Sequence, residues 1–323
     1  MPLRVFVVIN SHFEEVEEAR RLLALHGLRE VDSVGEADLV IALGDDRCVL
    51  DAVQAVGERD LPILGVSTGG AGYLTSISVE ELGAALEAVV RGEYELATYT
   101  KLKGVVDGSL VVYALNEIAV FPSKSAALMS YELLIDGEPV WSDRADGVII
   151  ATPLGSTAYA LSAGGAIVFE GARVLEVVPV NSVDVAKRPL VIPDTSTVEV
   201  RGITSKYQCE IVADGGSRVR VREGVTVARA ETDVRIVRLF SKPSVRETLR
   251  EKLAETLDVP PSAKFVLKML ELKGPMSARE LAEETMLPER TVRRALSELQ
   301  RRGLIRRIVN LRDARQFFYE ALR

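Results

Sequence analysis

The chain has 323 residues, a net charge of −7 and only two cysteines, Cys48 and Cys209. This length predicts two or three domains with a sizeable buried core. The two widely spaced cysteines support neither a disulfide scaffold nor a cysteine-rich zinc site, and no apolar run is long enough to span a bilayer. The sequence passes from Met1 directly into an apparent strand without a signal-type region, so we expect a cytoplasmic protein with no membrane partner.

The charge is unevenly distributed along the chain. Residues 258–323 carry 14 Lys/Arg against 9 Asp/Glu, a net of +5, whereas the rest carries 26 against 38, a net of −12. A basic tail and an acidic body are expected to meet different partners. The predicted linker between them is 257–261, because its consecutive prolines end any preceding helix.

Strands and helices alternate through the first 95 residues. Apolar runs predict strands at 4–10, 38–43 and 61–66, and periodic apolar residues predict helices at 14–26, 49–56 and 79–91. This alternation indicates an α/β domain with a parallel sheet, in which ligands sit at the carboxyl ends of the strands.

The turns after the second and third strands are therefore the first candidate sites. Gly44 and Asp45 follow the second strand, where a carboxylate can orient a hydroxyl or hold a metal ion, or can simply cap the next helix. Four glycines within residues 65–72 follow the third strand and allow close backbone approach to a ligand, although a flexible turn needs no ligand. Neither turn is a Walker A loop or a G-x-G-x-x-G fingerprint.

From about residue 96 the pattern changes to short apolar segments separated by turns such as Asp107-Gly108 and Asp214-Gly215. An antiparallel β-sandwich is predicted. Its expected strands lie at 103–106, 110–120, 128–135, 138–141, 147–151, 190–192, 197–201, 208–213, 218–221 and 225–228.

Two polar segments stand out within this β-rich region. Asn116-Glu117 interrupts an apolar strand, and such a buried pair is either a structural hydrogen-bond node or a ligand contact. The strand at 147–151 should stop before Pro153 and open into a turn rich in glycine and hydroxyl groups. That turn suits a ligand carrying ribose and phosphate, or it is an ordinary turn leading into a helix.

Residues 262–323 have the pattern of a winged helix-turn-helix domain of the α+β class. Helices are predicted at 263–272, 277–285 and 289–301, followed by a β-hairpin over 303–309 and 316–319. We expect double-stranded DNA as the partner, with a dimerisation module as the alternative. The candidate DNA-binding residues are Arg290, Thr291, Arg293 and Arg294 on the third helix, and Arg306, Arg307, Arg312 and Arg315 in the wing.

Together, these motifs resemble the NAD kinase family. The family's Gly-Gly-Asp-Gly-Thr loop corresponds to 43–47, its second glycine-rich loop to 65–75 and its Ala-Leu-Asn-Glu strand to 114–117. Segments 146–147, 152–159, 161–165, 188–189 and 214–215 also match, and 240–253 resembles the family's closing segment. The resemblance implies a parallel α/β domain of the NAD kinase and diacylglycerol kinase type at 1–95, joined by 235–256, and a β-sandwich NAD-binding domain at 96–234.

The resemblance also implies an activity. The 2′-hydroxyl of NAD's adenosine ribose would attack the γ-phosphate of ATP, with Mg²⁺ assisting, or polyphosphate would replace ATP. Asp45 matches the acidic residue that activates the hydroxyl, and no separate protein metal site is implied. Backbone groups at Gly44, Gly69, Gly70 and Gly72 would approach the phosphates. The residues that match the dinucleotide pocket are Asn116, Glu117, Asp146, Thr157, Ala158 and Tyr159.

The first loop departs from the family pattern, because Leu43, Asp46 and Arg47 replace two glycines and a threonine. Asp46 adds negative charge near polyphosphate, which Arg47 would offset by contacting phosphate oxygens. Ser67 replaces the usual Asn, and 180–187 departs from the usual proline-rich segment. Two readings follow: an active NAD kinase that also regulates genes, or a catalytically impaired regulator that senses NAD(P) or ATP. A lipid or sugar kinase is a more distant alternative, and a homo-oligomer, a dimer or a tetramer, is expected.

Overall fold

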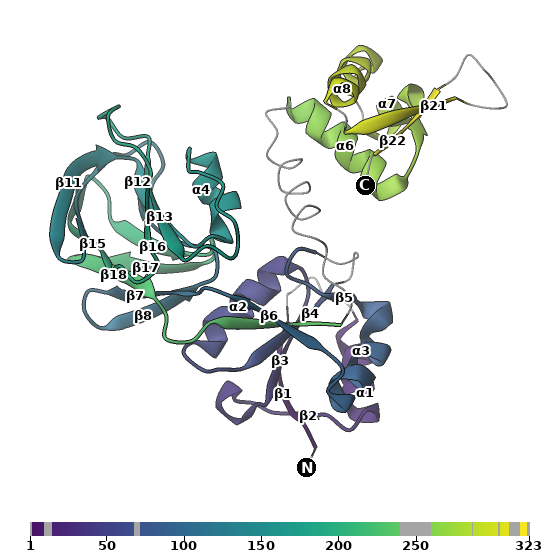
Figure 1. Cartoon of the computed structure of the whole chain (residues 1–323), viewed down its shortest axis with the longest axis horizontal. Coiled ribbons are helices and arrows are strands. Elements are labelled where there is room, and N and C mark those ends of the chain that lie inside the picture. The colour runs from purple at the N-terminus through teal and green to yellow at the C-terminus, as the bar shows by residue number, and fades with distance from the viewer. Residues whose placement is uncertain are drawn as a thin grey trace. The chain divides into compact units, whose positions relative to one another are not determined.

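The computed structural model describes residues 2–9, 15–67, 72–239, 260–285, 287–302, 304–309 and 317–321. The chain divides into two compact units, Met1–Lys242 and Pro243–Arg323 (Figure 1). The predicted closing segment at 240–253 and residues 257–259 of the predicted linker lie outside the described residues. Within the described ranges, no helix is both long enough and apolar enough to cross a membrane.

A seven-stranded sheet begins the first unit, in the order β2-β1-β3-β4-β19-β6, with β5 paired to β4. All neighbours are parallel except β6, which runs antiparallel to β19 at the edge. The strands are β1 (Arg4–Ile9), β2 (Arg29–Glu30), β3 (Leu39–Leu43), β4 (Pro62–Ser67), β5 (Ile77–Ser78), β6 (Glu95–Tyr99) and β19 (Val234–Arg238).

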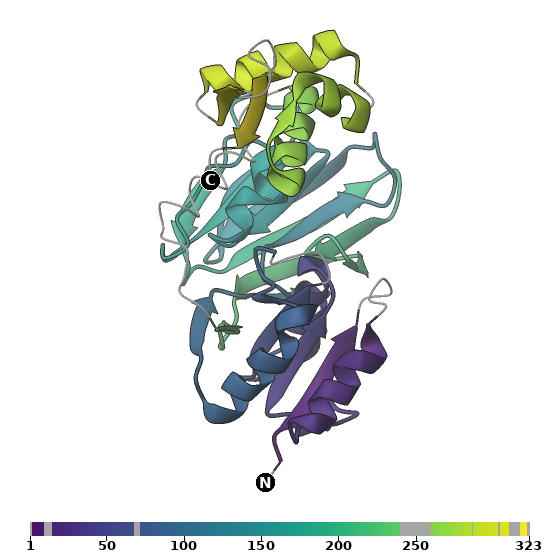
Figure 2. The ribbon, with the colours of Figure 1, turned by 90° about the vertical axis from the view of Figure 1, so that its right-hand side faces the viewer.

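Helices cover both faces of this sheet. Ile41 and Leu43 of β3 pack in the same cluster as residues of α1 (Val16–Leu25) and α3 (Leu82–Arg91), which Figure 2 shows side by side in front of the strands. Val40 and Ala42 point the other way and pack with α2 (Asp46–Val56). Because both faces are buried, the strands read as continuous apolar runs. Two 3-10 turns, η1 (Val34–Glu36) and η2 (Val79–Glu81), complete this part.

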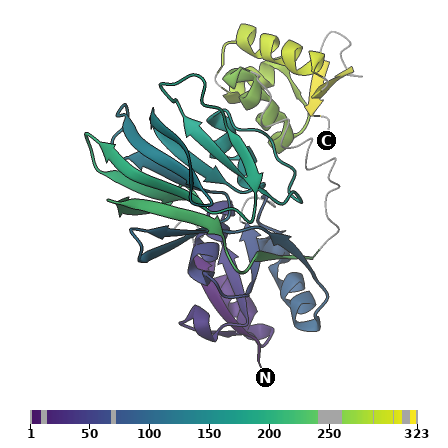
Figure 3. The same cartoon turned by 60° about the vertical axis from the view of Figure 1, so that its left-hand side comes forward.

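Two antiparallel six-stranded sheets form the rest of the first unit (Figure 3). One has the order β11-β10-β15-β18-β7-β8 and the other β14-β13-β12-β9-β16-β17. Their strands are β7 (Leu102–Val106), β8 (Leu110–Ala114), β9 (Glu117–Pro122), β10 (Met129–Ile135), β11 (Glu138–Ala145), β12 (Gly147–Ala151), β13 (Val174–Val180), β14 (Leu190–Pro193), β15 (Val198–Ser205), β16 (Cys209–Ala213), β17 (Ser217–Val221) and β18 (Gly224–Arg229).

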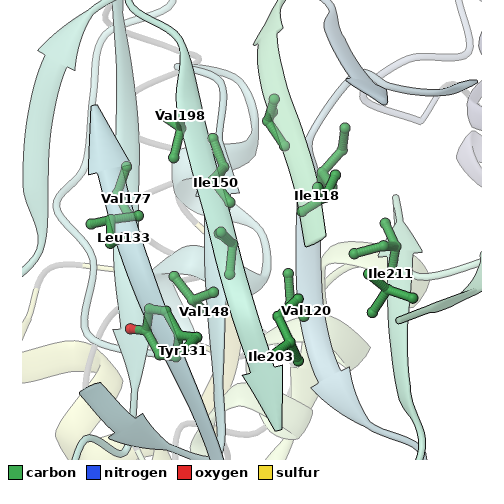
Figure 4. Packing of buried hydrophobic residues seen from close by; sticks show 14 of the residues in the cluster. Ile118, Val120, Tyr131, Leu133, Val148, Ile150, Val177, Val198, Ile203 and Ile211 are labelled. Atoms are coloured by element: carbon green, nitrogen blue, oxygen red, sulfur yellow. The ribbon is translucent and has the colours of Figure 1, made fainter. Parts of the chain in front are cut away.

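The two sheets bury one shared core between them. Leu133 and Val198 from the first sheet meet Ile118 and Ile150 from the second, and none of the four is exposed (Figure 4). This packing confirms the predicted β-sandwich.

The structure corrects two predicted boundaries and adds one strand. The strand expected at 110–120 is two strands, because β8 and β9 belong to different sheets. Strand β13 was not predicted, since Glu176 and Pro179 interrupt its apolar pattern. The domain boundary expected after residue 95 falls later, because β6 pairs with β19 in the parallel sheet.

The second unit contains α6 (Pro261–Lys273), α7 (Ala278–Thr285), α8 (Glu289–Arg301) and a small sheet. The sheet has the order β20-β22-β21, with β20 (Met276–Ser277), β21 (Ile305–Val309) and β22 (Phe317–Ala321). Val266, Leu281 and Leu296 are buried in its separate core. Three helices and a β-hairpin confirm the predicted winged-helix architecture.

Candidate active site

Asp45 lies at the carboxyl end of the parallel sheet, where β3 turns into α2. The Gly44 N–H donates to the Val66 carbonyl of the neighbouring strand (2.8 Å), which fixes the turn. The exposed Asp45 carboxylate caps α2 by accepting a hydrogen bond from the Cys48 N–H (3.3 Å). Capping, one of the roles expected for Asp45, therefore occurs in the structure.

The carboxylate of Asp46 turns inward and holds the segment that follows β4. It accepts hydrogen bonds from the backbone N–H groups of Tyr73 (2.9 Å), Leu74 (3.0 Å) and Thr75 (2.9 Å). The Thr75 hydroxyl also lies 3.3 Å from Asp46 Oδ1. The negative charge expected to face polyphosphate is thus used within the fold. Of the second loop, 68–71, including Gly69 and Gly70, lie outside the described residues.

Arg238 of β19 holds the same segment from its carbonyl side. Its guanidinium donates to the Tyr73 carbonyl (3.0 Å) and lies within 3.2 Å of the Ser76 hydroxyl. Gly65 permits the close approach of this segment to β4, because a Cβ there would sit 2.9 Å from Thr75 Cα. Residues 72–76 are therefore fixed on both sides before any ligand arrives.

Arg47 connects α2 to the β-sandwich. Its guanidinium donates to the Asp214 carbonyl (2.5 Å) and to the Asp51 carboxylate (3.0 Å). It also fills the space over Gly216, where a Cβ would be 1.1 Å from Nη2. In this structure the Arg47 side chain serves an internal contact, while its predicted contact with phosphate stays a prediction.

The Asp214 carboxylate fixes the backbone of Asn116 and Glu117. It accepts hydrogen bonds from the N–H groups of Leu115 (2.8 Å), Asn116 (2.7 Å) and Glu117 (3.2 Å). Burial raises the pKa of Asp214 to about 6, against the opposing effect of these hydrogen bonds. The backbone of Asn116-Glu117 therefore belongs to a structural hydrogen-bond node, which was one of the two predicted interpretations. The Asn116 side chain is half-buried.

The hydroxyl-rich turn after β12 packs directly on Asn116. The Thr152 hydroxyl donates to the Leu115 carbonyl (2.7 Å), and the Thr152 N–H donates to the Asn116 carbonyl (2.9 Å). A Cβ on Gly155 would come within 2.0 Å of the Asn116 oxygen, so only glycine fits there. The turn continues through η3 (Gly155–Thr157) into α4 (Tyr159–Ser162), which leaves Thr157 and Ala158 half-buried and Tyr159 exposed.

Glu117 is a buried carboxyl beneath this turn. The Tyr159 backbone N–H donates to it, and Oε2 is buried without a hydrogen-bond partner among the residues that the structure describes. Burial and the nearby Asp214 raise the pKa of Glu117 to about 8. A carboxyl that is protonated near neutrality can both donate and accept a hydrogen bond, as recognition of a sugar hydroxyl or a base requires.

The aromatic ring of Tyr159 extends over the outer face of the β9–β12 sheet. It stacks on Phe121, with 5.6 Å between ring centroids, and Phe121 packs on Gly147, where a Cβ would lie 2.3 Å from the ring. Asp146 accepts a hydrogen bond from the Asn181 side-chain amide (2.9 Å). Ala151, the last residue of β12, pairs with Glu117, whereas Asp146 immediately precedes the first residue of β12. Asp146 therefore lies about 17 Å along the strand from the Glu117 pair.

The predicted residues therefore form two groups rather than one. The first group is linked by contacts at the carboxyl end of the sheet and around Asp214. It comprises Gly44, Asp45, Arg47, Gly72, Asn116 and Glu117, with Thr157, Ala158 and the Tyr159 backbone above them. Asp146 lies at the opposite end of β12. Phe121 and Arg238 were not predicted from the sequence, because Phe121 resembles an ordinary strand residue and Arg238 is the last residue of an apolar strand.

A cavity of about 320 Å³ lies beside α2. It is lined by Arg47, Leu50, Asp51, Gln54, Tyr113, Ala213, Asp214, Gly216 and Ser217. Among the described residues, no three His, Cys, Asp or Glu side chains are grouped to hold a metal ion.

In the second unit, α8 presents a basic face opposite its buried residues. Val292, Leu296 and Leu299 are buried, whereas Arg290, Arg293 and Arg294 are exposed and Thr291 is half-buried. Arg293 is paired with Glu289 (2.6 Å). In the wing, Arg306 pairs with Glu320 (2.6 Å), and the Arg307 guanidinium lies 3.2 Å from the Phe317 ring centroid. The predicted Arg312 and Arg315 lie outside the described residues.

Comparison with known families divides the chain in the same way. The model of the ATP-NAD kinase N-terminal domain matches residues 14–94, and that of the C-terminal domain matches 115–239. The model of the MarR family matches residues 257–316.

Individual relatives agree with these matches. An NAD kinase of Methanopyrus kandleri is 36% identical over 217 residues, which cover 67% of this chain and 78% of the relative. An NAD kinase of Methanothermobacter thermautotrophicus is 36% identical over 222 residues, which cover 68% and 77%.

Solved structures share the fold of the first unit. An NAD kinase from Archaeoglobus fulgidus, crystallised with ATP, has a TM-score of 0.64 and 27% identity, and the match covers 78% of this chain and 98% of that one. Yeast NADH kinase in complex with NADH has a TM-score of 0.68, covers 80% and 88%, and at 21% identity shows a common fold alone. With both kinase domain models matched and these relatives covered over most of their length, the chain belongs to the NAD kinase family and carries a MarR-family domain after it.

Proposed function

We propose that the chain transfers the γ-phosphate of ATP to the 2′-hydroxyl of NAD. The observation that carries this proposal is a continuous set of contacts from Asp45 to the pocket wall: Arg47, in the first turn of the helix that Asp45 caps, contacts Asp214, and Asp214 holds Asn116 and Glu117. These contacts support the proposal, because they connect an exposed carboxylate with polar groups of the kind that bind an adenosine ribose.

The proposed step is an in-line phosphoryl transfer. The Asp45 carboxylate accepts the proton of the 2′-hydroxyl, the ribose oxygen bonds to the γ-phosphorus, and the bond from that phosphorus to the oxygen of the ADP leaving group breaks. Mg²⁺ bound to the phosphates of ATP would neutralise their charge. Asn116, Glu117, Thr157, Ala158 and Tyr159 are the proposed dinucleotide contacts. Inorganic polyphosphate is the alternative donor.

The test is an assay of the purified full-length chain with NAD, ATP and Mg²⁺, in which NADP is measured by chromatography. Asp45→Asn is the matched variant, because Asn caps a helix about as well as Asp but is not a base. We expect NADP from the wild type and a loss of about 100-fold or more in the variant. Tight NAD or NADP binding without product would instead support the sensing regulator.

We also propose that the MarR-family domain binds double-stranded DNA through α8, which gives the chain a regulatory role. The supporting observation is the pair Arg290 and Arg294, which lie one turn apart on the face opposite the buried Val292 and Leu296. A dimer or tetramer is proposed because such domains commonly read paired half-sites.

A DNA titration over a range of salt concentrations tests this second proposal. With DNA from upstream of the protein's own coding sequence, Arg290→Ala/Arg294→Ala should weaken binding and lower the salt slope by about 2. Arg21→Ala is the control, because it removes an arginine on α1 of the other unit whose side chain is 79% exposed. An unchanged slope in the double variant would contradict the assignment of α8.

A further inference from the structure

The segment Gly72–Thr75 has the geometry of a small anion-binding site. Three successive N–H groups, those of Tyr73, Leu74 and Thr75, converge on one carboxylate, and the Thr75 hydroxyl adds a fourth polar group. Consecutive backbone N–H groups that point into one concavity are a recurrent receptor for phosphate and other anions. The segment runs beside β4, where the Ser76 N–H donates to the Gly65 carbonyl (2.9 Å), near the carboxyl ends of the parallel strands. Ligands of parallel α/β sheets bind at those ends.

Asp46 fills that concavity completely. Oδ1 lies 3.0 Å from the Leu74 nitrogen and 2.9 Å from the Thr75 nitrogen, while Oδ2 lies 2.9 Å from the Tyr73 nitrogen. A Cβ on Gly72 would lie 2.4 Å from Oδ1, so the backbone closes over the carboxylate as well. Thr75 is only 1% exposed. Within the described part of the chain, these donors are thus all engaged by Asp46.

We propose that Asp46 acts as an internal anion that occupies an oxyanion site, and that it thereby determines which groups are available to the phosphoryl donor. The carboxylate presents oxygen and negative charge to the N–H groups of residues 73–75, as a phosphate would. The donor's phosphates are then held by other groups, and a chain with glycine at position 46 has the site open. The inference deepens the proposed function, but it concerns anion binding and does not require turnover.

The first experiment measures binding of inorganic tripolyphosphate to the full-length chain by calorimetry at constant ionic strength. Asp46→Gly should bind it at least about tenfold more tightly than the wild type, since one hydrogen bond to a charged group accounts for that factor. Glu80→Gln is the control, because it removes an exposed carboxylate five residues beyond Thr75 and leaves the N–H groups unchanged. Equal affinities in Asp46→Gly and Glu80→Gln would overturn the proposal.

The second experiment locates the site by hydrogen exchange of the peptide that contains residues 73–75. In the wild type its amides should be protected with or without tripolyphosphate. In Asp46→Gly they should exchange faster, and tripolyphosphate should restore their protection. Tighter binding with no change in this peptide would place the anion elsewhere and overturn the assignment.

A third variant applies if Asp46→Gly does not fold. Asp46→Asn keeps the size of the side chain and one acceptor oxygen but removes the charge. We expect at least about tenfold faster exchange at residues 73–75, because hydrogen bonds to charged acceptors are replaced by neutral ones. Exchange equal to that of the wild type would overturn the proposal. An inactive kinase with the expected anion binding would instead overturn the proposed function alone.

Discussion

Three aspartates, Asp46, Asp107 and Asp214, each accept hydrogen bonds from three consecutive backbone N–H groups. Asp46 holds residues 73–75, Asp107 holds 222–224 and Asp214 holds 115–117. Their environments differ. At Asp107, burial opposes ionisation, but the three N–H groups outweigh it and the pKa is lowered. At Asp214, deeper burial prevails and the pKa is raised to about 6. The same hydrogen-bonding arrangement therefore accompanies opposite net pKa shifts, because the two carboxylates differ in burial.

Asp45 allows capping to be separated from catalysis. Asp45→Ala should lower the free energy of unfolding by about 1 kcal/mol, because the Cys48 N–H loses its acceptor. Asp45→Asn should remain within about 0.5 kcal/mol of the wild type. Urea unfolding of both variants is the measurement. If Asn destabilises as much as Ala, the side chain at position 45 does not act as a cap.

Glu117 should make stability fall as pH rises. The unfolded carboxyl ionises near 4.5 and the folded one near 8, so the folded state binds the proton more tightly. The free energy of unfolding therefore decreases between those values, by up to a few kcal/mol. Glu117→Gln cannot titrate, so its stability relative to the wild type should be greater at pH 8 than at pH 5.

Thermal melts at the two pH values test this dependence. Glu132→Gln is the control, because Glu132 is an exposed glutamate on β10 of the same sandwich. A difference between Glu117→Gln and the wild type that does not change with pH would contradict the raised pKa.

At the scale of elements, the turn after β12 depends on one glycine. Gly155→Ala should destabilise the first unit by roughly 2 kcal/mol or more, because the new Cβ would lie 2.0 Å from a backbone oxygen that cannot rotate away. Gly171→Ala is the matched control, since a Cβ there meets nothing within 4 Å. Urea unfolding of the two variants should differ by that amount, and equal midpoints would show that the turn can shift to accommodate the methyl group.

The elements that sequence predicted best are those bounded by proline. β12 and α8 have their predicted limits because Pro153 and Pro288 mark where each segment stops or starts. β13 was not predicted because Glu176 and Pro179 interrupt its apolar pattern. The strand is stabilised by its pairing with β12 and β14, which the sequence does not show. At the site, the place of Asp45 just after a parallel strand was enough to identify it as a candidate residue. The partners of Asp46 and Arg47 were not predictable, because sequence does not show which distant N–H or carbonyl will meet a given side chain.

At the scale of the molecule, the two units have separate cores, so they should unfold separately. Calorimetry of the full chain should show two transitions. NADP at 100 times its dissociation constant should stabilise only the transition of the first unit, by about 2.7 kcal/mol. Double-stranded DNA should shift only the other. A single transition that both ligands move together would contradict independent units.

The spacing of the aspartate contacts also sets the order in which the site is completed during synthesis. Asp46 and Leu74 are 28 residues apart, whereas Asp214 follows Leu115 by 99 residues. At about 5–20 residues per second, the ribosome needs roughly 1–6 s for the first interval and 5–20 s for the second. Residues 115–117 therefore wait, without the carboxylate that will hold them, until most of the sandwich has left the ribosome. The contacts of Asp46 can therefore form before those of Asp214, and the Arg238 contact with the Tyr73 carbonyl forms after both.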